Sequence, residues 1–297
     1  MAATPVAICG MGLRLPGRIK NDADMYKFLM EKRDARSIVP KSRYDIEKYY
    51  NEHSKKGTII SKYGYFLEDD LTHFDLSMIS MTSVEASRLD PTQRVLLEVV
   101  RETFENSGEA DFRGKNIGTF ANGYGRAEGI ACLYVKRLDE AIRDGNPVRA
   151  VIRASASNAD GKTAALTVPN PVAHESFIRQ AYENAGLSFR DTAMVECHGS
   201  GTFVGDSLEV SAGHSEGASA ITSIIKAVVS LENTTILPNI KFTTPSPKIP
   251  WKTGKLQVPT EPLPWPEDRR ERISVNSFGI GGSNVHVSII SKLEPTK

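Results

Sequence analysis

The side chains best suited to chemistry in this sequence are two histidines, His198 and His214, which lie within one short stretch. Each stands beside glycine and hydroxyl-bearing residues, in ECHGSGT at 196–202 and GHSEG at 213–217. Imidazoles in such a setting can polarise a carbonyl oxygen or carry a proton. A single histidine near a strand end is more often structural, but a pair separated mainly by small residues favours a site. Neither has metal-ligand spacing to a cysteine or to the other, so we expect no metal.

The elements around these histidines predict an α/β fold. A buried strand is expected to end at Val195, and the glycine-rich run after it lets a substrate approach the backbone. Apolar spacing predicts helices at 22–31, 83–105, 130–144, 173–185 and 218–231, and strands at 116–120, 148–153, 273–275 and 285–290. The first strand, 6–9, runs into a Gly10 and Gly12 turn, but the next glycine is Gly17 and no helix start follows. The dinucleotide-binding fingerprint therefore fails.

Composition narrows the class of protein further. The 297 residues carry 37 Lys+Arg against 36 Asp+Glu, a net charge of +1, so bulk charge indicates neither nucleic acid nor an anionic membrane as a partner. No stretch resembles a signal peptide or a membrane span. The three cysteines, an odd number in apolar sequence, suit free thiols in a reducing compartment, and we expect a cytoplasmic protein.

None of the cysteines is expected to be a nucleophile. Cys9 falls in the first predicted strand and Cys132 in the predicted helix 130–144. Cys197 directly precedes His198, but adjacent residues on a strand point to opposite faces. The segment 238–266 is rich in proline and is expected to wrap the surface.

Seven motifs, in order along nearly the whole chain, resemble the β-ketoacyl synthase domain of polyketide synthases, and of fungal highly reducing synthases in particular. They are VAICGMGLRLPG (6–17), LDPTQR (89–94), ANGYGRAEG (121–129), ASNADG (156–161), ECHGSGT (196–202), GHSEG (213–217) and NSFGIGGSN (276–284). The resemblance implies one thiolase-like domain over 1–297, with layers α-β-α-β-α. Its related halves would be about 1–120 and 121–297, and it would form a homodimer.

The resemblance also implies a chemistry. In that family an active-site cysteine takes an acyl group from a carrier-protein thioester, and two histidines assist decarboxylation of a malonyl extender, whose enolate attacks the acyl-cysteine. His198 and His214 match these histidines. Ser200, where threonine is more usual, and Thr202 match hydroxyls near the phosphopantetheine arm, and the backbone N–H of Ile280 matches an oxyanion donor. The implied partner is an acyl carrier protein in trans, with no bound cofactor.

Two family segments have no counterpart here. The segment bearing the nucleophilic cysteine on a strand-to-helix elbow would fall between Phe120 and Ala121. A helix and a lysine-bearing strand would fall between Val210 and Ser211. Lys226 matches a different lysine, carried by a helix and structural in role. The predicted fold is therefore the family fold with two internal deletions.

Three functions follow from this pattern. The first is a condensing enzyme whose coding segments are missing from the sequence. The second is a non-catalytic partner or remnant that pairs with an intact ketosynthase. The third is a decarboxylase of malonyl thioesters that uses His198 and His214 without acyl transfer.

Overall fold

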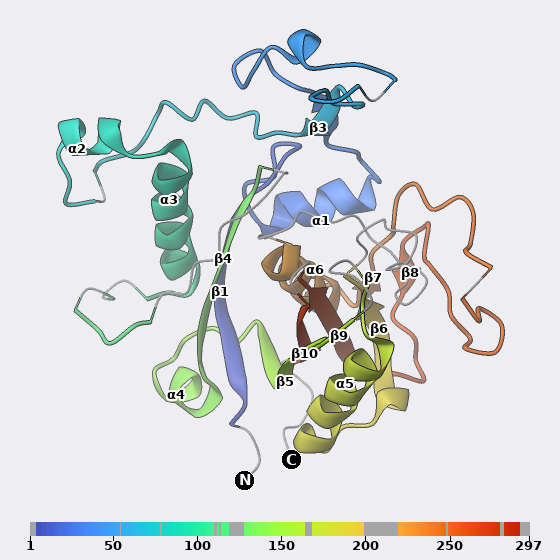
Figure 1. Ribbon diagram of the computed structural model, residues 1–297. Coiled ribbons are helices and arrows are strands. Elements are labelled where there is room, and N and C mark those ends of the chain that lie inside the picture. The colour runs from blue at the N-terminus through green and yellow to red at the C-terminus, as the bar shows by residue number, and fades with distance from the viewer. Residues whose placement is uncertain are drawn as a thin grey trace.

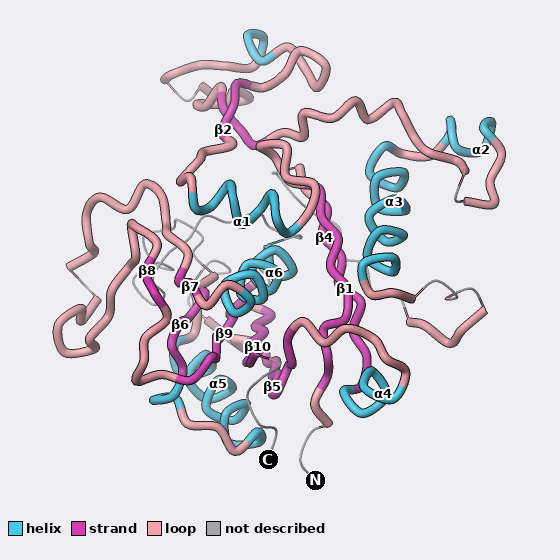
Figure 2. Tube along the Cα trace, turned by 180° about the vertical axis from the view of Figure 1, so that it is seen from behind, coloured by secondary structure: helices cyan, strands magenta, loops and turns pink. Residues whose placement is uncertain are grey.

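The computed structural model describes residues 4–53, 55–77, 79–109, 112, 114–118, 128–163, 168–198, 219–247, 249–279 and 282–291. Within these ranges, six strands form one sheet in the order β4-β1-β5-β10-β9-β6 (Figures 1 and 2). Neighbouring strands are antiparallel, except that β6 runs parallel to β9. The strands are β1 Val6–Arg14, β4 Ile130–Arg137, β5 Ala150–Ala159, β6 Thr192–Glu196, β9 Arg270–Phe278 and β10 Ser283–Ser291.

Three helices, α3, α5 and α6, pack on the strands of this sheet. Helix α3 packs on β1 and β4, α5 packs on β5 and β10, and α6 lies between them against β9, β10, β4 and α1 (Figure 1). The described residues thus show one central sheet with helices packed on it, which is part of the expected α-β-α-β-α layering. The helices are α1 Asp22–Met30, α2 Ser83–Arg88, α3 Pro91–Asn106, α4 Leu138–Arg143, α5 Pro171–Ala185 and α6 Ser219–Glu232.

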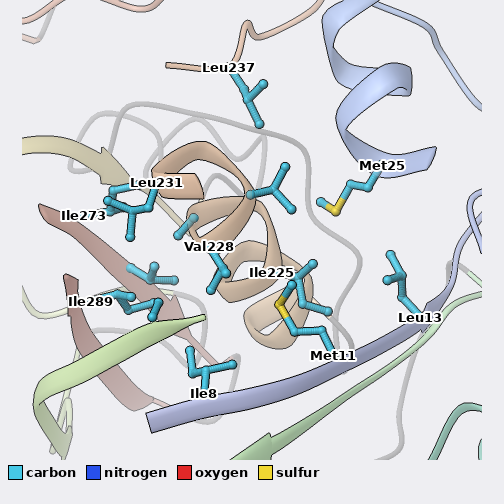
Figure 3. Packing of buried hydrophobic residues seen from close by; sticks show 14 of the residues in the cluster. Ile8, Met11, Leu13, Met25, Ile225, Val228, Leu231, Leu237, Ile273 and Ile289 are labelled. Atoms are coloured by element: carbon cyan, nitrogen blue, oxygen red, sulfur yellow. The ribbon is translucent and has the colours of Figure 1, made fainter. Parts of the chain in front are cut away.

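Helix α6 forms the centre of the core. Every residue from Ile225 to Leu231 is buried, as expected for a helix enclosed by layers on several sides. The cluster around it draws on strands from both predicted halves, with Ile8 and Leu13 from β1, Ile273 from β9 and Ile289 from β10 (Figure 3).

Local capping signals set most helix boundaries. Asp90 caps α3 and forms a capping box with Gln93, and Pro91 opens the helix. A second capping box at Thr82 begins α2, so the predicted helix 83–105 is two helices with a break at Leu89 and Asp90. Helix α5 ends at Gly186, whose φ of 63° is the left-handed conformation that glycine favours.

The glycines of the first strand correct one prediction. Strand β1 does not turn at Gly10 and Gly12 but continues to Arg14. A Cβ on Gly10 would lie 2.2 Å from the carbonyl oxygen of Thr103, and one on Gly12 would lie 2.6 Å from that of Val99. Both glycines therefore allow the backbone of α3 to pack directly on the strand.

The predicted helix 130–144 is also wrong in its first half. Residues Ile130–Arg137 form strand β4, which pairs along the whole of β1, and only Leu138–Arg143 is helical. Tertiary pairing with β1 overrides a helix-like apolar spacing that is ambiguous over so short a run. Cys132 consequently lies on a strand opposite Gly12. In the predicted strand 116–120, residues 116–118 are not in a strand, and 119 and 120 lie outside the described residues.

The remaining segments form the periphery. Residues 36–65 contain the two-stranded pair β2 Arg36–Ile38 and β3 Tyr63–Tyr65 and a short 3₁₀ helix, Ile46–Lys48. The described part of 238–266 is irregular apart from β8 Leu263–Pro264, which pairs with β7 Thr235–Ile236. A second 3₁₀ helix, Phe189–Asp191, precedes β6. Among the helices of the described residues, none has the length and apolar character to cross a bilayer.

Candidate active site

A cavity of about 220 Å³ lies where the end of β6, the first turns of α6 and helix α1 meet. Strand β6 delivers Glu196, Cys197 and His198 to it, and β9 contributes Asn276. The opposite wall is apolar, because α1 supplies Met25, Phe28 and Leu29. Of the residues matched to the family site, His198 is the one that the structure describes, and it borders this cavity.

A buried ion pair forms the floor of the cavity beside His198. Lys226 Nζ lies 2.8 Å and 3.0 Å from the two carboxylate oxygens of Glu196, and both side chains are 8% exposed. Glu196 is the last residue of β6 and pairs in register with Val275 on β9. The ion pair therefore ties the end of β6 to the central helix, two residues before His198. Lys226 was expected to have a structural role, and this ion pair is a contact through which it can have one.

Aromatic contacts link His198 to the start of the closing glycine-rich turn. Its ring centroid lies 5.6 Å from that of Phe278, the last residue of β9. The Phe278 ring also lies 4.0 Å, centroid to centroid and tilted by 36°, from that of His174 in α5. His174 Nε2 lies 3.0 Å from Asp160 Oδ1 without hydrogen-bond geometry. The Asp160 carboxylate accepts a 2.8 Å hydrogen bond from Asn284 in β10.

The closing turn is held by its own backbone. Gly279 N–H donates to Ser283 O at 2.7 Å, and Gly282 N–H donates to Gly279 O at 2.8 Å. Asp160 N–H donates to Gly282 O at 2.8 Å, which ties the turn to the end of β5. Ile280, the expected oxyanion donor of this turn, lies outside the described residues.

A further histidine contacts Asn276, which lines the cavity, and the sequence reasoning did not single it out. His286 on β10 is 1% exposed, and its Nδ1 lies 2.7 Å from Asn276 Oδ1, while Nε2 lies 3.2 Å from the Ser288 hydroxyl. A neutral imidazole protonated on Nδ1 satisfies both contacts. Burial lowers the pKa of His286 from 6.5 to about 4, so this ring is uncharged at neutral pH.

The three thiols differ in their surroundings. Cys9 is buried, and burial raises the pKa of its thiol to about 11. Burial also raises the pKa of Cys132, which is half-buried against α3. Cys197 is half-buried and, like His198, follows the end of β6 and borders the cavity.

The other predicted site residues fall in segments that the structure does not describe. Ser200, Thr202 and His214 belong to the stretch 199–218 and stay sequence-based assignments. Within the described ranges, no group of three or more His, Cys, Asp or Glu side chains is arranged to hold a metal ion.

Three family models match successive parts of the chain. The β-ketoacyl synthase N-terminal domain matches residues 3–121, the β-ketoacyl synthase C-terminal domain matches 149–212, and the ketoacyl-synthetase C-terminal extension matches 245–297. The chain belongs to the β-ketoacyl synthase family. It is similar in sequence to fungal polyketide synthases. It is 40% identical over 420 positions to the squalestatin hexaketide synthase clz14 of Cochliobolus lunatus, with 97% of this chain and 16% of that protein covered.

A second fungal relative agrees with this assignment, and two solved ketosynthases have the same fold. The highly reducing polyketide synthase VdtX of Byssochlamys spectabilis is 40% identical, with 96% of this chain and 19% of that protein covered. The oxazolomycin ketosynthase domain OzmH KS7 of Streptomyces albus JA3453 superposes with a TM-score of 0.86 at 21% identity, covering 99% of this chain and 75% of that one. The ketosynthase from module 6 of the Bacillus subtilis 168 bacillaene synthase gives a TM-score of 0.84 at 22% identity, covering 98% and 72%.

The lengths of these alignments bear on the internal deletions. The alignment with the squalestatin synthase spans 420 positions, more than the 297 residues of this ketosynthase, so the relative carries aligned residues that this chain lacks. The solved ketosynthase OzmH KS7 is likewise covered to only 75% although nearly all of this chain is used. The thiolase-like fold expected from the motifs is confirmed, and a truncated form of it is consistent with these lengths.

Proposed function

We propose that this ketosynthase is a condensing-type protein of polyketide biosynthesis in which decarboxylative Claisen condensation is impaired. The observation that carries the proposal is the alignment of 420 positions against a chain of 297 residues. The segment expected to bear the family's nucleophilic cysteine falls at the junction of Phe120 and Ala121. Without it, an acyl group has no elbow cysteine on which to wait for the extender.

The retained chemistry lies in the half of the site that acts on the extender. In this proposal His198 and His214 donate hydrogen bonds to the thioester carbonyl as malonate loses carbon dioxide, which stabilises the enolate oxygen as its charge develops. Ser200 and Thr202 contact the phosphopantetheine arm of a carrier protein, and the Ile280 N–H faces an oxyanion. The Glu196–Lys226 ion pair supports the assignment for His198, because it anchors the strand end that delivers that imidazole.

The partners of the proposed function are a carrier protein acting in trans and a second ketosynthase subunit, either a copy of this chain or an intact relative. No bound cofactor is needed, because the acyl and malonyl groups arrive as thioesters. A cytoplasmic setting is part of the proposal, since the three cysteines of the chain form no disulfide.

Restoration of the missing segments tests this proposal. The two segments of a fungal relative would be grafted between residues 120 and 121 and between 210 and 211, and both chains would be given acetyl and malonyl groups on a carrier protein. We expect a β-ketoacyl product from the grafted chain and none from the chain as it stands. A graft with its own cysteine changed to alanine is the control. Product formation by the ungrafted chain would refute the impairment.

A second candidate function is that of a non-catalytic partner of an intact ketosynthase. The sheet favours it, because β4 and β6 are the outer strands among the described residues, and outer strands present backbone groups that a further strand can pair with. Size-exclusion chromatography of this chain mixed with an intact fungal ketosynthase tests it. Co-elution at equimolar ratio supports the partner role, and separate elution over the full concentration range ends it.

A further inference from the structure

The small net charge of the chain hides an uneven distribution. Segment 36–65 carries seven Lys and Arg against three Asp and Glu, whereas the whole chain is nearly balanced. The same segment contains five of the nine tyrosines. It forms a lobe beyond helix α1, at the top of Figures 1 and 2, which we call the tyrosine lobe. The proposed function uses no residue of this lobe.

The small sheet of the tyrosine lobe has an exposed apolar face. In the β2–β3 pair, Ile38 lies directly opposite Tyr63, and Arg36 lies opposite Tyr65. All four side chains share one face, because alternate residues of a strand point to the same side. Ile38, Tyr63 and Tyr65 are 57%, 51% and 41% exposed, and the Arg36 guanidinium lies 4.4 Å from the centre of the Tyr63 ring. This face therefore meets solvent rather than the core.

Further exposed side chains of both kinds belong to the same lobe. Large hydrophobic side chains that are at least 38% exposed are Tyr44, Tyr49, Ile59 and Ile60. Lys48 and Lys62 pair with carboxylates of the lobe itself. Lys41, Lys55 and Lys56 are exposed, and no ion pair within the described residues includes them. The lobe thus combines an apolar surface with positive charge that the described part of the chain does not neutralise.

We propose that the tyrosine lobe binds the surface of an anionic lipid bilayer. Its lysines are attracted by the negative head groups, and its exposed tyrosine and isoleucine side chains enter the boundary between head groups and acyl chains. Tyrosine suits this boundary because its ring is apolar and its hydroxyl is polar. The cytoplasmic leaflet carries the anionic lipids, which agrees with the proposed cytoplasmic setting. The inference does not rest on the proposed condensation chemistry.

The exposed isoleucines favour a bilayer over other acidic partners. Nucleic acids are bound through their phosphates and by stacking on aromatic rings, to which an aliphatic side chain contributes little. An acidic peptide needs a groove or a free sheet edge, and β2 and β3 are only three residues long. Neither the cavity beside His198 nor a second cavity of about 520 Å³ beside α3 has a residue of 36–65 in its lining. A flat lipid surface requires no groove.

Co-sedimentation of the full chain with lipid vesicles tests the proposal. The vesicles would be phosphatidylcholine with or without phosphatidylserine. We expect binding to the phosphatidylserine vesicles, weakened by added salt, and none to phosphatidylcholine alone. A lysine near an anionic surface contributes about fivefold to partitioning, so Lys41→Gln/Lys55→Gln/Lys56→Gln should bind about 100-fold more weakly. The matched control, Lys162→Gln/Lys252→Gln/Lys255→Gln, removes three exposed lysines outside the lobe and should bind as the unchanged chain does.

A second variant tests the apolar contribution. Ile38→Ser/Ile60→Ser should bind about 10-fold more weakly with unchanged circular dichroism, because both side chains are exposed in the free protein. If this double variant does not fold, Ile60→Ser alone makes the same test.

Several results would overturn the proposal. They are no sedimentation with either kind of vesicle, equal loss of binding in the two lysine variants, and unchanged binding of the isoleucine variant. Capture of poly-glutamate or RNA by a chain that leaves phosphatidylserine vesicles unbound would assign the lobe to that polymer instead. Because no thioester is present, the outcome is independent of the grafting experiment above.

Discussion

Replacement of Lys226 by methionine should destabilise the protein strongly. The change keeps a side chain of similar length in the core but leaves the Glu196 carboxylate, 8% exposed, without the ammonium that lies 2.8 Å from it. Breaking one side of a buried ion pair typically costs about 3–5 kcal/mol, because the remaining charge is desolvated and unpaired. Against a total stability of roughly 5–15 kcal/mol, this is a large fraction.

The assay is urea unfolding followed by circular dichroism, with the free energy of unfolding extrapolated to water. The matched control is Lys62→Met, because Lys62 also pairs with a glutamate at 2.8 Å, but the Glu47 side chain is 68% exposed. That exposed pair should contribute little to stability, because solvent screens its attraction. The double variant Glu196→Gln/Lys226→Met should recover part of the loss by removing the stranded charge. A loss for Lys226→Met no larger than the control's would refute the reasoning.

Three further results are expected. Because burial lowers the pKa of His286 to about 4, the unfolded chain takes up a proton near pH 6.5 that the folded chain does not. The contribution of His286 to stability should be constant above pH 6.5 and fall by up to about 3 kcal/mol toward pH 4, and this part of the slope should vanish in His286→Gln. Gly10→Ala should cost about 1–3 kcal/mol in urea unfolding, since its Cβ meets backbone at 2.2 Å. Gly129→Ala should cost less, because its Cβ comes closest to the tip of the Leu15 side chain, at 3.2 Å, and equal losses would contradict the packing argument. Asp90→Ala should lose about 0.5–2 kcal/mol with its capping bonds, and an unchanged unfolding midpoint would show that the cap is not needed.

Local signals in the sequence were sufficient for elements whose ends are set by nearby residues. The caps at Asn21, Asp90 and Asn170 lie at the observed starts of α1, α3 and α5. Strand β4 was missed because its identity depends on β1, more than a hundred residues earlier in the chain. A short apolar run has no local feature that distinguishes a strand from a helix in such a case.

In the candidate site, too, local sequence signals identified some residues, while contacts between distant residues were missed. His198 was found because glycine and hydroxyl residues surround it in sequence. The Glu196–Lys226 pair was not foreseen as an ion pair, because its members are thirty residues apart and meet only through the packing of α6 on β9. The His286–Asn276 contact likewise needs the register of β10 on β9, in which these two residues are directly opposite. A single sequence contains no signal for either.

The strand order has a consequence for biosynthesis. Strand β10, the latest in the described sequence, lies between β5 and β9. Until residues 283–291 leave the ribosome, β4, β1 and β5 form one unit and β9 and β6 another, with no strand to join them. Contacts of such long sequence separation fold slowly. During synthesis the nascent chain therefore exposes two incomplete sheets, and we expect its yield in cells to depend on chaperone supply more than on the stability of the finished fold.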